Sequence, residues 1–138
     1  MSKREMKKLL AVVMTVTLLC GCATLLGGPS DEESIQTMLS DWKAALESEN
    51  LDDIMAFYSE DYKDEQIESK DELQNFIGRA IDQGYLASVD IFIEDAIIEV
   101  DGDTATAGPV QLAVSMSVKY QLKKEGKSWR IVGAEQDY

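Results

Sequence analysis

Residues 110–122 read VQLAVSMSVKYQL, with a large apolar side chain at every second position. Successive side chains of a β-strand point to opposite faces of a sheet, so this period of two predicts one strand with a buried face and a solvated face. Hairpin turns are indicated on either side of it, at 101–103 (DGD) and 124–127 (KEGK), because each contains a glycine that can adopt a positive φ. With neighbouring strands at 104–107 and 129–134, the C-terminal part is predicted to be an antiparallel meander.

Upstream of this meander, a long extended segment is predicted at 85–100. Apolar residues alternate from 89 to 93 and again from 98 to 100, while the sequence EDA at 94–96 interrupts the pattern. Such an interruption indicates a bulge or kink. Gly108 and Pro109 are predicted to interrupt strand pairing in the same way.

Three helices are predicted before the sheet. The first begins at Ser30 or Asp31, and its apolar residues recur at intervals of three and four. A second, shorter helix is predicted from 50–52 to about Ser59, and a short strand at 62–67 follows it. The third helix begins at the capping box SKDE at 69–72 and ends near Gly84, which can adopt the left-handed conformation of a helix end. The buried stripe of the third helix is predicted to include Phe76. Helices followed by an antiparallel sheet place the chain in the α+β class.

The first 22 residues have the pattern of a bacterial export signal. Four basic residues precede an apolar run at 9–19, which is too short to span a bilayer because a spanning helix needs roughly 20 residues. The sequence LCGC at 19–22 resembles a lipobox, in which Cys22 becomes the lipidated first residue of the mature protein. We therefore predict a lipoprotein signal peptide at 1–21, a lipidated N-terminus and flexible tether at 22–30, and one domain at 31–138. An ordinary signal peptide cut near Ala23 is the alternative.

The charge of the chain limits the kinds of partner that it can bind. The 117 residues from Cys22 onward carry 9 Lys and Arg against 25 Asp and Glu, a formal net charge of −16, and the whole chain has no histidine. Such acidity repels phosphate backbones, so nucleic acid is not an expected partner. The lipid is the expected contact with the membrane, which places the domain in the cell envelope, either outside the cytoplasmic membrane or on the outer membrane facing the periplasm. The sequence DGD at 101–103 lacks the further ligands of a calcium loop, and we predict no metal site and no cofactor.

The sequences of several segments resemble those of the nuclear-transport-factor-2-like, or SnoaL-like, superfamily. These segments are WKAAL at 42–46, NLDDIM at 50–55, Tyr58, DY at 61–62 and WRIV at 129–132. The resemblance implies a cone-shaped, cystatin-like α+β barrel, in which three N-terminal helices pack in a strongly curved antiparallel sheet. Its open end is often a pocket for an apolar or amphipathic ligand, and members commonly pair through the exposed face of the sheet. A homodimer is therefore implied, with Gln111, Ser115 and Ser117 on that face.

Enzymes of the superfamily such as ketosteroid isomerase use a tyrosine on the first helix and an aspartate after the second. The resemblance puts Trp42 at the position of that tyrosine and Gln66 at the position of that aspartate. An indole N–H is a far weaker acid than a phenol, and an amide cannot accept a proton at neutral pH. The remaining acids of this region are Asp61, Asp64 and Glu65. We predict no catalytic residue, with Asp61, Asp64 and Tyr58 as the weak alternatives.

The leading hypothesis is a lipid-anchored, non-enzymatic domain that binds a small apolar ligand or an envelope protein. The side chains expected to line its pocket are aromatic, sulfur-containing or amide: Trp42, Tyr58, Tyr62, Gln66, Phe76, Met116 and Tyr120. One alternative is an enzyme of the isomerase, dehydratase or polyketide-cyclase kind with an aspartate base and a tyrosine donor. The other is an accessory lipoprotein without a ligand.

Overall fold

Helix α2 (Asp31–Ser48) begins where its apolar periodicity begins. A computed structural model of the protein describes residues 28–137, and the predicted signal peptide, Cys22 and most of the tether lie outside the described residues. The stripe of α2 predicted from spacing is buried. Its members are Ile35, Met38, Leu39, Trp42, Ala45 and Leu46. In the part of the chain that the structure describes, no helix has the length and apolarity needed to cross a membrane.

Side-chain caps fix the starts of the two following helices. Helix α3 (Leu51–Met55) is capped by Asn50, whose side-chain oxygen accepts from the Asp53 N–H. Helix α4 (Lys70–Asp82) is capped by Ser69, which accepts from the Glu72 N–H, as the capping box predicts. Gly84 follows α4 with a φ of 76°.

The segment after α3 was expected to continue the helix and then form a strand at 62–67, and both expectations are wrong. Helix α3 ends at Met55 because the next residues bond to strand β4 (Ser128–Gln136) instead. The Ile131 N–H donates to the Phe57 carbonyl at 2.9 Å, and the Ser59 N–H donates back to the Ile131 carbonyl at 2.9 Å. The Lys63 N–H then donates to the Val132 carbonyl at 3.2 Å. Residues 57–63 thus cover the middle of one edge of the sheet.

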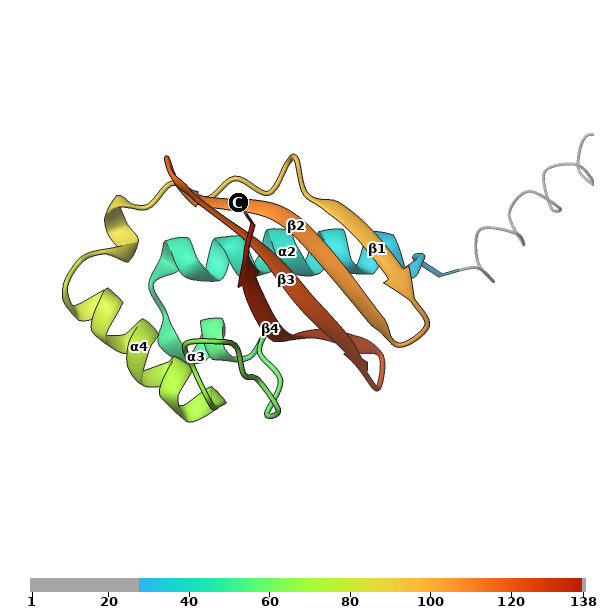
Figure 1. Ribbon diagram of the computed structural model, residues 1–138, viewed down its shortest axis with the longest axis horizontal. Helices are drawn as coiled ribbons and strands as arrows, with labels where there is room; N and C mark the ends of the chain where they lie inside the picture. Colours follow the sequence, from blue (N-terminus) through green and yellow to red (C-terminus); the bar gives the residue numbers. More distant parts are fainter. Residues whose placement is uncertain (1–27, 138) are drawn as a thin grey trace, which may run out of the picture. The chain divides into compact units, whose positions relative to one another are not determined.

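The sheet has four antiparallel strands in sequence order: β1 (Ile97–Asp101), β2 (Thr104–Ala113), β3 (Met116–Glu125) and β4. The single strand predicted at 110–122 is wrong, because the chain turns at Val114 and Ser115 (Figure 1). Val110 pairs with Val118 and both are buried, so even-numbered residues face the core on β3 and, after the register shift at Gly108 and Pro109, on β2 as well. Before that shift the buried residues of β2 are odd-numbered, Ala105 and Ala107. The apolar residues at 110–122 therefore keep their spacing of two across the turn, and this spacing alone could not reveal that the chain turns there.

The segment 85–96 is not the long strand that its alternation predicts. It contains a short 3-10 helix, η1 (Leu86–Ser88), and one isolated bridge between Phe92 and Gln111 before a turn at 94–95 leads into β1. Ile91 is buried in the core. The apolar pattern of this segment therefore reflects burial against the domain rather than continuous strand pairing. The predicted interruption at Gly108 and Pro109 is confirmed as a register shift between Ala107 and Val110.

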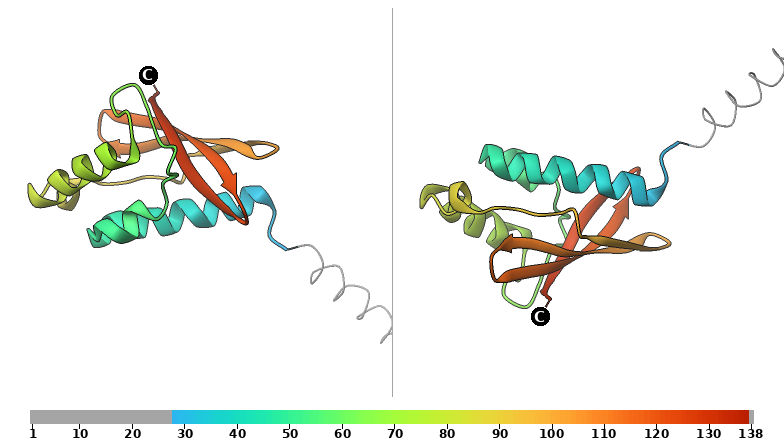
Figure 2. Two further views of the ribbon diagram at one scale, coloured as in Figure 1. Left: turned by 90° about the horizontal axis from the view of Figure 1, so that it is seen from below. Right: turned by 90° about the horizontal axis from the view of Figure 1, so that it is seen from above.

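Helix α2 lies against the inner face of the twisted sheet (Figure 2). The core between them contains the inward residues of three strands, among them Val110, Leu122 and Ile131, which are almost completely buried. Helices α3 and α4 contact each other, and α3 also contacts α2, near the C-terminal end of α2 (Figure 1).

The start of α2 is joined to the opposite end of the sheet. The Lys124 ammonium donates to Asp31 Oδ1 at 2.8 Å, and the Trp129 indole N–H lies 3.4 Å from the same oxygen. These donors, the hydrogen bond from Lys124 above all, hold the pKa of Asp31 below its usual value of 3.8.

Because the folded pKa of Asp31 lies below the unfolded one, the ion pair stabilises the fold above pH 4 and this contribution is lost as the pH falls through the folded pKa. We expect Lys124→Met to unfold at lower urea concentration than wild type at pH 6, and the difference to shrink toward pH 3. Lys127→Met, which removes an exposed lysine of the next turn, is the control. A difference between Lys124→Met and wild type that stays constant from pH 6 to pH 3 would contradict the assignment.

Candidate functional site

Four aromatic side chains predicted as pocket residues lie together inside the domain. Trp42, Tyr58, Tyr62 and Tyr120 are each at most 6% exposed. The Trp42 and Tyr120 rings meet edge to face at 5.2 Å between centroids, and the Tyr58 and Tyr62 rings do so at 5.4 Å. The Trp42 indole N–H donates to the Tyr58 hydroxyl oxygen at 3.1 Å. This aromatic cluster fills the space between α2 and the sheet.

Burial makes the phenols of the aromatic cluster weak acids. It raises the pKa of Tyr58 to about 12, against a small opposing effect of the Trp42 N–H. Burial also raises the pKa of Tyr62, with a further contribution from the Asp64 carboxylate that accepts its hydrogen bond, and burial raises the pKa of Tyr120. All three tyrosines are therefore neutral at physiological pH, and the Tyr62 hydroxyl donates to Asp64.

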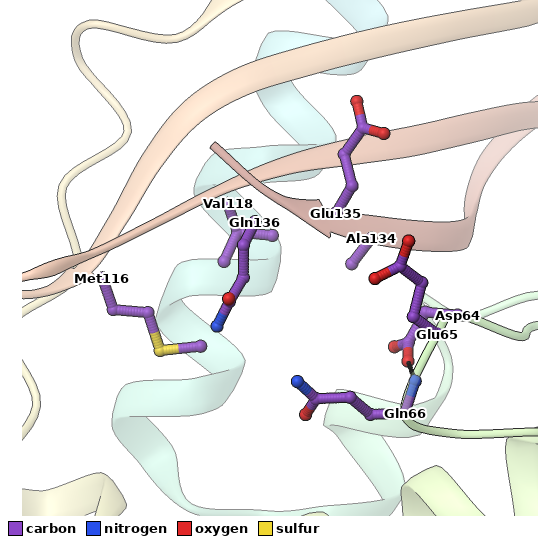
Figure 3. A pocket seen from close by; sticks show the side chains of 8 residues that line it. All are labelled: Asp64, Glu65, Gln66, Met116, Val118, Ala134, Glu135 and Gln136. Atoms are coloured by element: carbon purple, nitrogen blue, oxygen red, sulfur yellow. Dashed lines mark hydrogen bonds between the residues drawn. The ribbon is translucent and has the colours of Figure 1, made fainter. Parts of the chain in front are cut away.

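A cleft of about 250 Å³ opens beside the aromatic cluster, at the end of the sheet where β3 begins and β4 ends (Figure 3). Its apolar surface comes from the two strands, and its polar surface comes from the loop before α4 and the end of β4. The lining residues are Asp64, Glu65, Gln66, Met116, Val118, Ala134, Glu135 and Gln136. Val118 lies on the same strand face as Tyr120, so the floor of the cleft continues into the aromatic cluster.

Asp64 shapes the loop side of the cleft. Its Oδ1 atom accepts from the backbone N–H groups of Gln66 at 2.7 Å and Ile67 at 2.9 Å. Its Oδ2 atom accepts from the Tyr62 hydroxyl at 2.5 Å. The carboxylate therefore ties the loop to the aromatic cluster and presents Gln66 to the cleft.

The structure brings only some of the sequence-predicted residues to the cleft. Gln66 and Met116 line it, and Asp64 and Glu65 form its wall. Asp61 lies outside the lining, where its carboxylate pairs with the Lys123 ammonium at 3.7 Å. Phe76 was expected in the buried stripe of α4, but its side chain is 54% exposed because Leu73 and Ile77 form the inner face of that helix.

Sequence reasoning missed the residues that β4 contributes to the cleft, Ala134, Glu135 and Gln136. They reach it because Val118 pairs with Gln136 across the sheet. The final hairpin at 124–127 gives the register only as far as Leu122 with Ile131, because a shift between Gln121 and Leu122 then moves the pairing by one residue. A second groove, of about 330 Å³, lies between α2 and the segment 93–98, lined by Leu39, Ile93 and Ile98 among others. Within residues 28–137, no three acidic side chains are arranged to hold a metal ion.

The tyrosine hydroxyls have unequal structural roles. Tyr62→Phe leaves Asp64 without its side-chain donor, so we expect a loss of about 1–2 kcal/mol in the free energy of unfolding. Within residues 28–137 the Tyr120 hydroxyl has no hydrogen-bond partner, so Tyr120→Phe serves as the matched control. Its expected change is below about 0.5 kcal/mol. Urea unfolding of both variants measures the difference, and equal losses would contradict it.

No protein-family model matches the sequence, and no curated protein matches it significantly. Solved structures do resemble it. Bd1075 of Bdellovibrio bacteriovorus is 12% identical with a TM-score of 0.63, and the match covers 74% of this chain but only 38% of that one. The chain thus corresponds to less than half of Bd1075.

Two matched structures are of similar length to this chain. A nuclear-transport-factor-2-like protein with a cystatin-like fold from Novosphingobium aromaticivorans is 21% identical, with a TM-score of 0.60 and 87% of each chain covered. A candidate dehydratase of the same structural family from Streptomyces avermitilis is 13% identical, with a TM-score of 0.57, covering 75% of this chain and 93% of that one. At these identities the likeness establishes the fold alone: the domain that begins at Asp31 has a nuclear-transport-factor-2-like, or cystatin-like, fold.

Proposed function

We propose that this domain is the extracytoplasmic part of a lipoprotein and that it binds a small molecule in the cleft described above. The lipobox at 19–22 and the short tether after it support the anchoring. The cleft is the observation that supports ligand binding. In this proposal the cleft is the open end of a cone closed at the other end by the sheet and α2.

The ligand is a small, mainly apolar molecule with one polar end. Met116, Val118 and Ala134 offer it a floor without charged groups, while the amides of Gln66 and Gln136 lie at the rim. The cleft volume of about 250 Å³ is just below the 300–1,000 Å³ of common ligand sites, so the ligand is smaller than a steroid.

Binding without catalysis fits the chemistry of the site. Trp42, at the position of the tyrosine donor in related enzymes, donates its N–H to Tyr58 inside the core. Gln66 has no basic group. Asp64 already accepts three hydrogen bonds, so most of its lone pairs are engaged before a substrate arrives.

Filling the cleft tests this function. We expect Met116→Trp to lower ligand affinity by about tenfold or more, which corresponds to about 1.4 kcal/mol. Met116 is 41% exposed, so a larger side chain is accommodated without repacking the core. Val114→Trp is the matched control, because Val114 is fully exposed in the next turn and does not line the cleft.

Native mass spectrometry of the purified mature protein reports any molecule retained during purification, and thermal-shift screening identifies others. A ligand that binds wild type and Val114→Trp equally well, and Met116→Trp more weakly, supports the proposal. Equal binding to all three proteins would place the ligand elsewhere. No binding to wild type at all would favour the accessory lipoprotein without a ligand.

One contact favours a second candidate function, proton transfer by the Tyr62 and Asp64 pair. An acid and a tyrosine converge at 2.5 Å at the cleft wall, and a similar fold occurs in the candidate dehydratase from Streptomyces avermitilis. If the domain is such an enzyme, Asp64→Asn abolishes turnover of a carbonyl substrate, while Asp61→Asn leaves turnover unchanged because Asp61 lies outside the cleft. Turnover that survives Asp64→Asn removes this candidate.

A homodimer through the outer face of the sheet is a further proposal. Gln111 pairs with Ser117 on that face, and Ser115 lies in the turn between β2 and β3. A solved structure from Xanthomonas campestris with the same fold is named as an association domain, at 15% identity and a TM-score of 0.61. Light scattering measures the mass in solution, and a monomer at high concentration would exclude the dimer.

A further inference from the structure

The chain enters the domain at the end farthest from the cleft. Asp31, the first residue of α2, is held beside the β3–β4 hairpin by Lys124 at 2.8 Å. The cleft is lined by Met116 and Gln136, which are the opposite ends of the same two strands. Strand β3 advances about 3.3 Å per residue, so Met116 lies about 30 Å from Glu125. In all three views the start of α2 lies toward the end of the sheet that carries the hairpin turns (Figures 1 and 2).

Only eight residues, 23–30, separate Cys22 from Asp31. Even fully extended, they reach no more than about 28 Å. A lipid on Cys22 therefore keeps the hairpin end within a short distance of the bilayer. The cleft can approach the bilayer only if the whole domain lies down on it.

Charge opposes that lying position. The mature chain has a formal net charge of −16, and a bilayer with anionic lipids repels it over a Debye length of about 8 Å. Acids are present on the cleft itself, at Asp64, Glu65 and Glu135, and no basic residue lines it. An acidic domain that is anchored at its hairpin end is therefore repelled so that its cleft end points away from an anionic bilayer.

The geometry points to a fixed polarity of the domain on the membrane: the β3–β4 hairpin end faces the bilayer, and the cleft opens into the aqueous phase. This inference rests on the proposed lipidation of Cys22. It deepens the proposed function, because the ligand of the cleft then arrives from the aqueous side and not from the leaflet that holds the anchor. Exposed Met116 and Val114, at the cleft end, meet that aqueous side as well.

Two single-cysteine variants of the full chain test the polarity. Lys127→Cys places a thiol in the β3–β4 turn, and Val114→Cys places one at the cleft end, both at exposed positions. Cys20 is removed with the signal peptide and the Cys22 thiol is blocked by the lipid, so a thiol-reactive dye labels only the introduced cysteine. The lipidated proteins are reconstituted into phosphatidylcholine and phosphatidylglycerol vesicles that carry a quencher on a fraction of the headgroups.

We expect the dye on Lys127→Cys to be quenched several-fold more than the dye on Val114→Cys. Inserting a Gly/Ser segment into the tether is expected to reduce the quenching at position 127. Equal quenching at the two positions, or stronger quenching at 114, would overturn the polarity while leaving the anchor intact. Dye uptake by the wild-type protein would show a free Cys22 thiol, in which case the anchor and the polarity both fail.

Discussion

Substitution of Trp42 by alanine is expected to lower the free energy of unfolding by about 3–5 kcal/mol. Trp42 is 1% exposed and lies at the centre of the aromatic cluster. The substitution removes the edge-to-face contact with Tyr120 and the N–H donor of Tyr58, and it leaves a cavity between α2 and the sheet. Chemical denaturation with circular dichroism measures the loss.

Trp42→Phe separates packing from hydrogen bonding. The phenyl ring keeps most of the contact with Tyr120 but cannot donate to the Tyr58 hydroxyl, so we expect a loss of about 1–3 kcal/mol, smaller than that of the alanine variant. A Trp42→Ala protein as stable as wild type would mean that the indole occupies a ligand pocket rather than a packed core. That result would support the prediction that Trp42 contacts a ligand.

Replacing Gly108 with alanine is the second change with a large expected effect. A Cβ at this position would lie 2.8 Å from the Cα atom of Lys119 on the neighbouring strand. That atom belongs to the backbone, so the strands β2 and β3 must separate locally, at a cost of about 1–3 kcal/mol. Thermal unfolding measures the change in stability.

Gly78→Ala is the matched control for Gly108→Ala. Gly78 lies inside α4, and a Cβ there meets only Leu51 Cδ2, at an ordinary contact distance of 3.6 Å. Alanine favours a helix interior over glycine by roughly 1 kcal/mol, so this variant is expected to be more stable than wild type. If Gly108→Ala were also stabilising, the close approach of β2 and β3 at this position would be wrong.

The helices were predictable because their signals are local. Asn50 and Ser69 cap helices within three residues of themselves, and the apolar stripe of α2 repeats over a single segment. Strand limits were harder to predict. The turn at Val114 and Ser115 contains neither glycine nor proline. The pairing across it preserves the apolar alternation at 110–122, which is typical of one strand. Only contacts between distant parts of the chain distinguish the two arrangements.

The candidate site was predictable only where its residues lie close in sequence. Asp64, Glu65 and Gln66 are consecutive, and the composition of the loop marks them as a polar group. The wall from β4 depends on a register between residues 18 apart, such as Val118 with Gln136, which residue types do not encode. For the tyrosines, the sequence suggested a role in the site that the structure does not show. Their types fit a ligand site equally well, but Tyr58 and Tyr62 find partners inside the protein, in Trp42 and Asp64.

The strip of chain at 57–63 protects part of the sheet edge from pairing with other molecules. It occupies the backbone groups of Ile131 and the Val132 carbonyl on the outer side of β4, while nothing within residues 28–137 pairs along the outer side of the five-residue strand β1. Open strand edges are the places where folded sheets join into longer assemblies. Because the strip covers the middle of the β4 edge, β1 is the edge that stays open along its whole length, and pairing along one edge alone cannot extend beyond two copies. Loss of the strip would expose the β4 edge as a second site for strand pairing, and copies could then add at both edges.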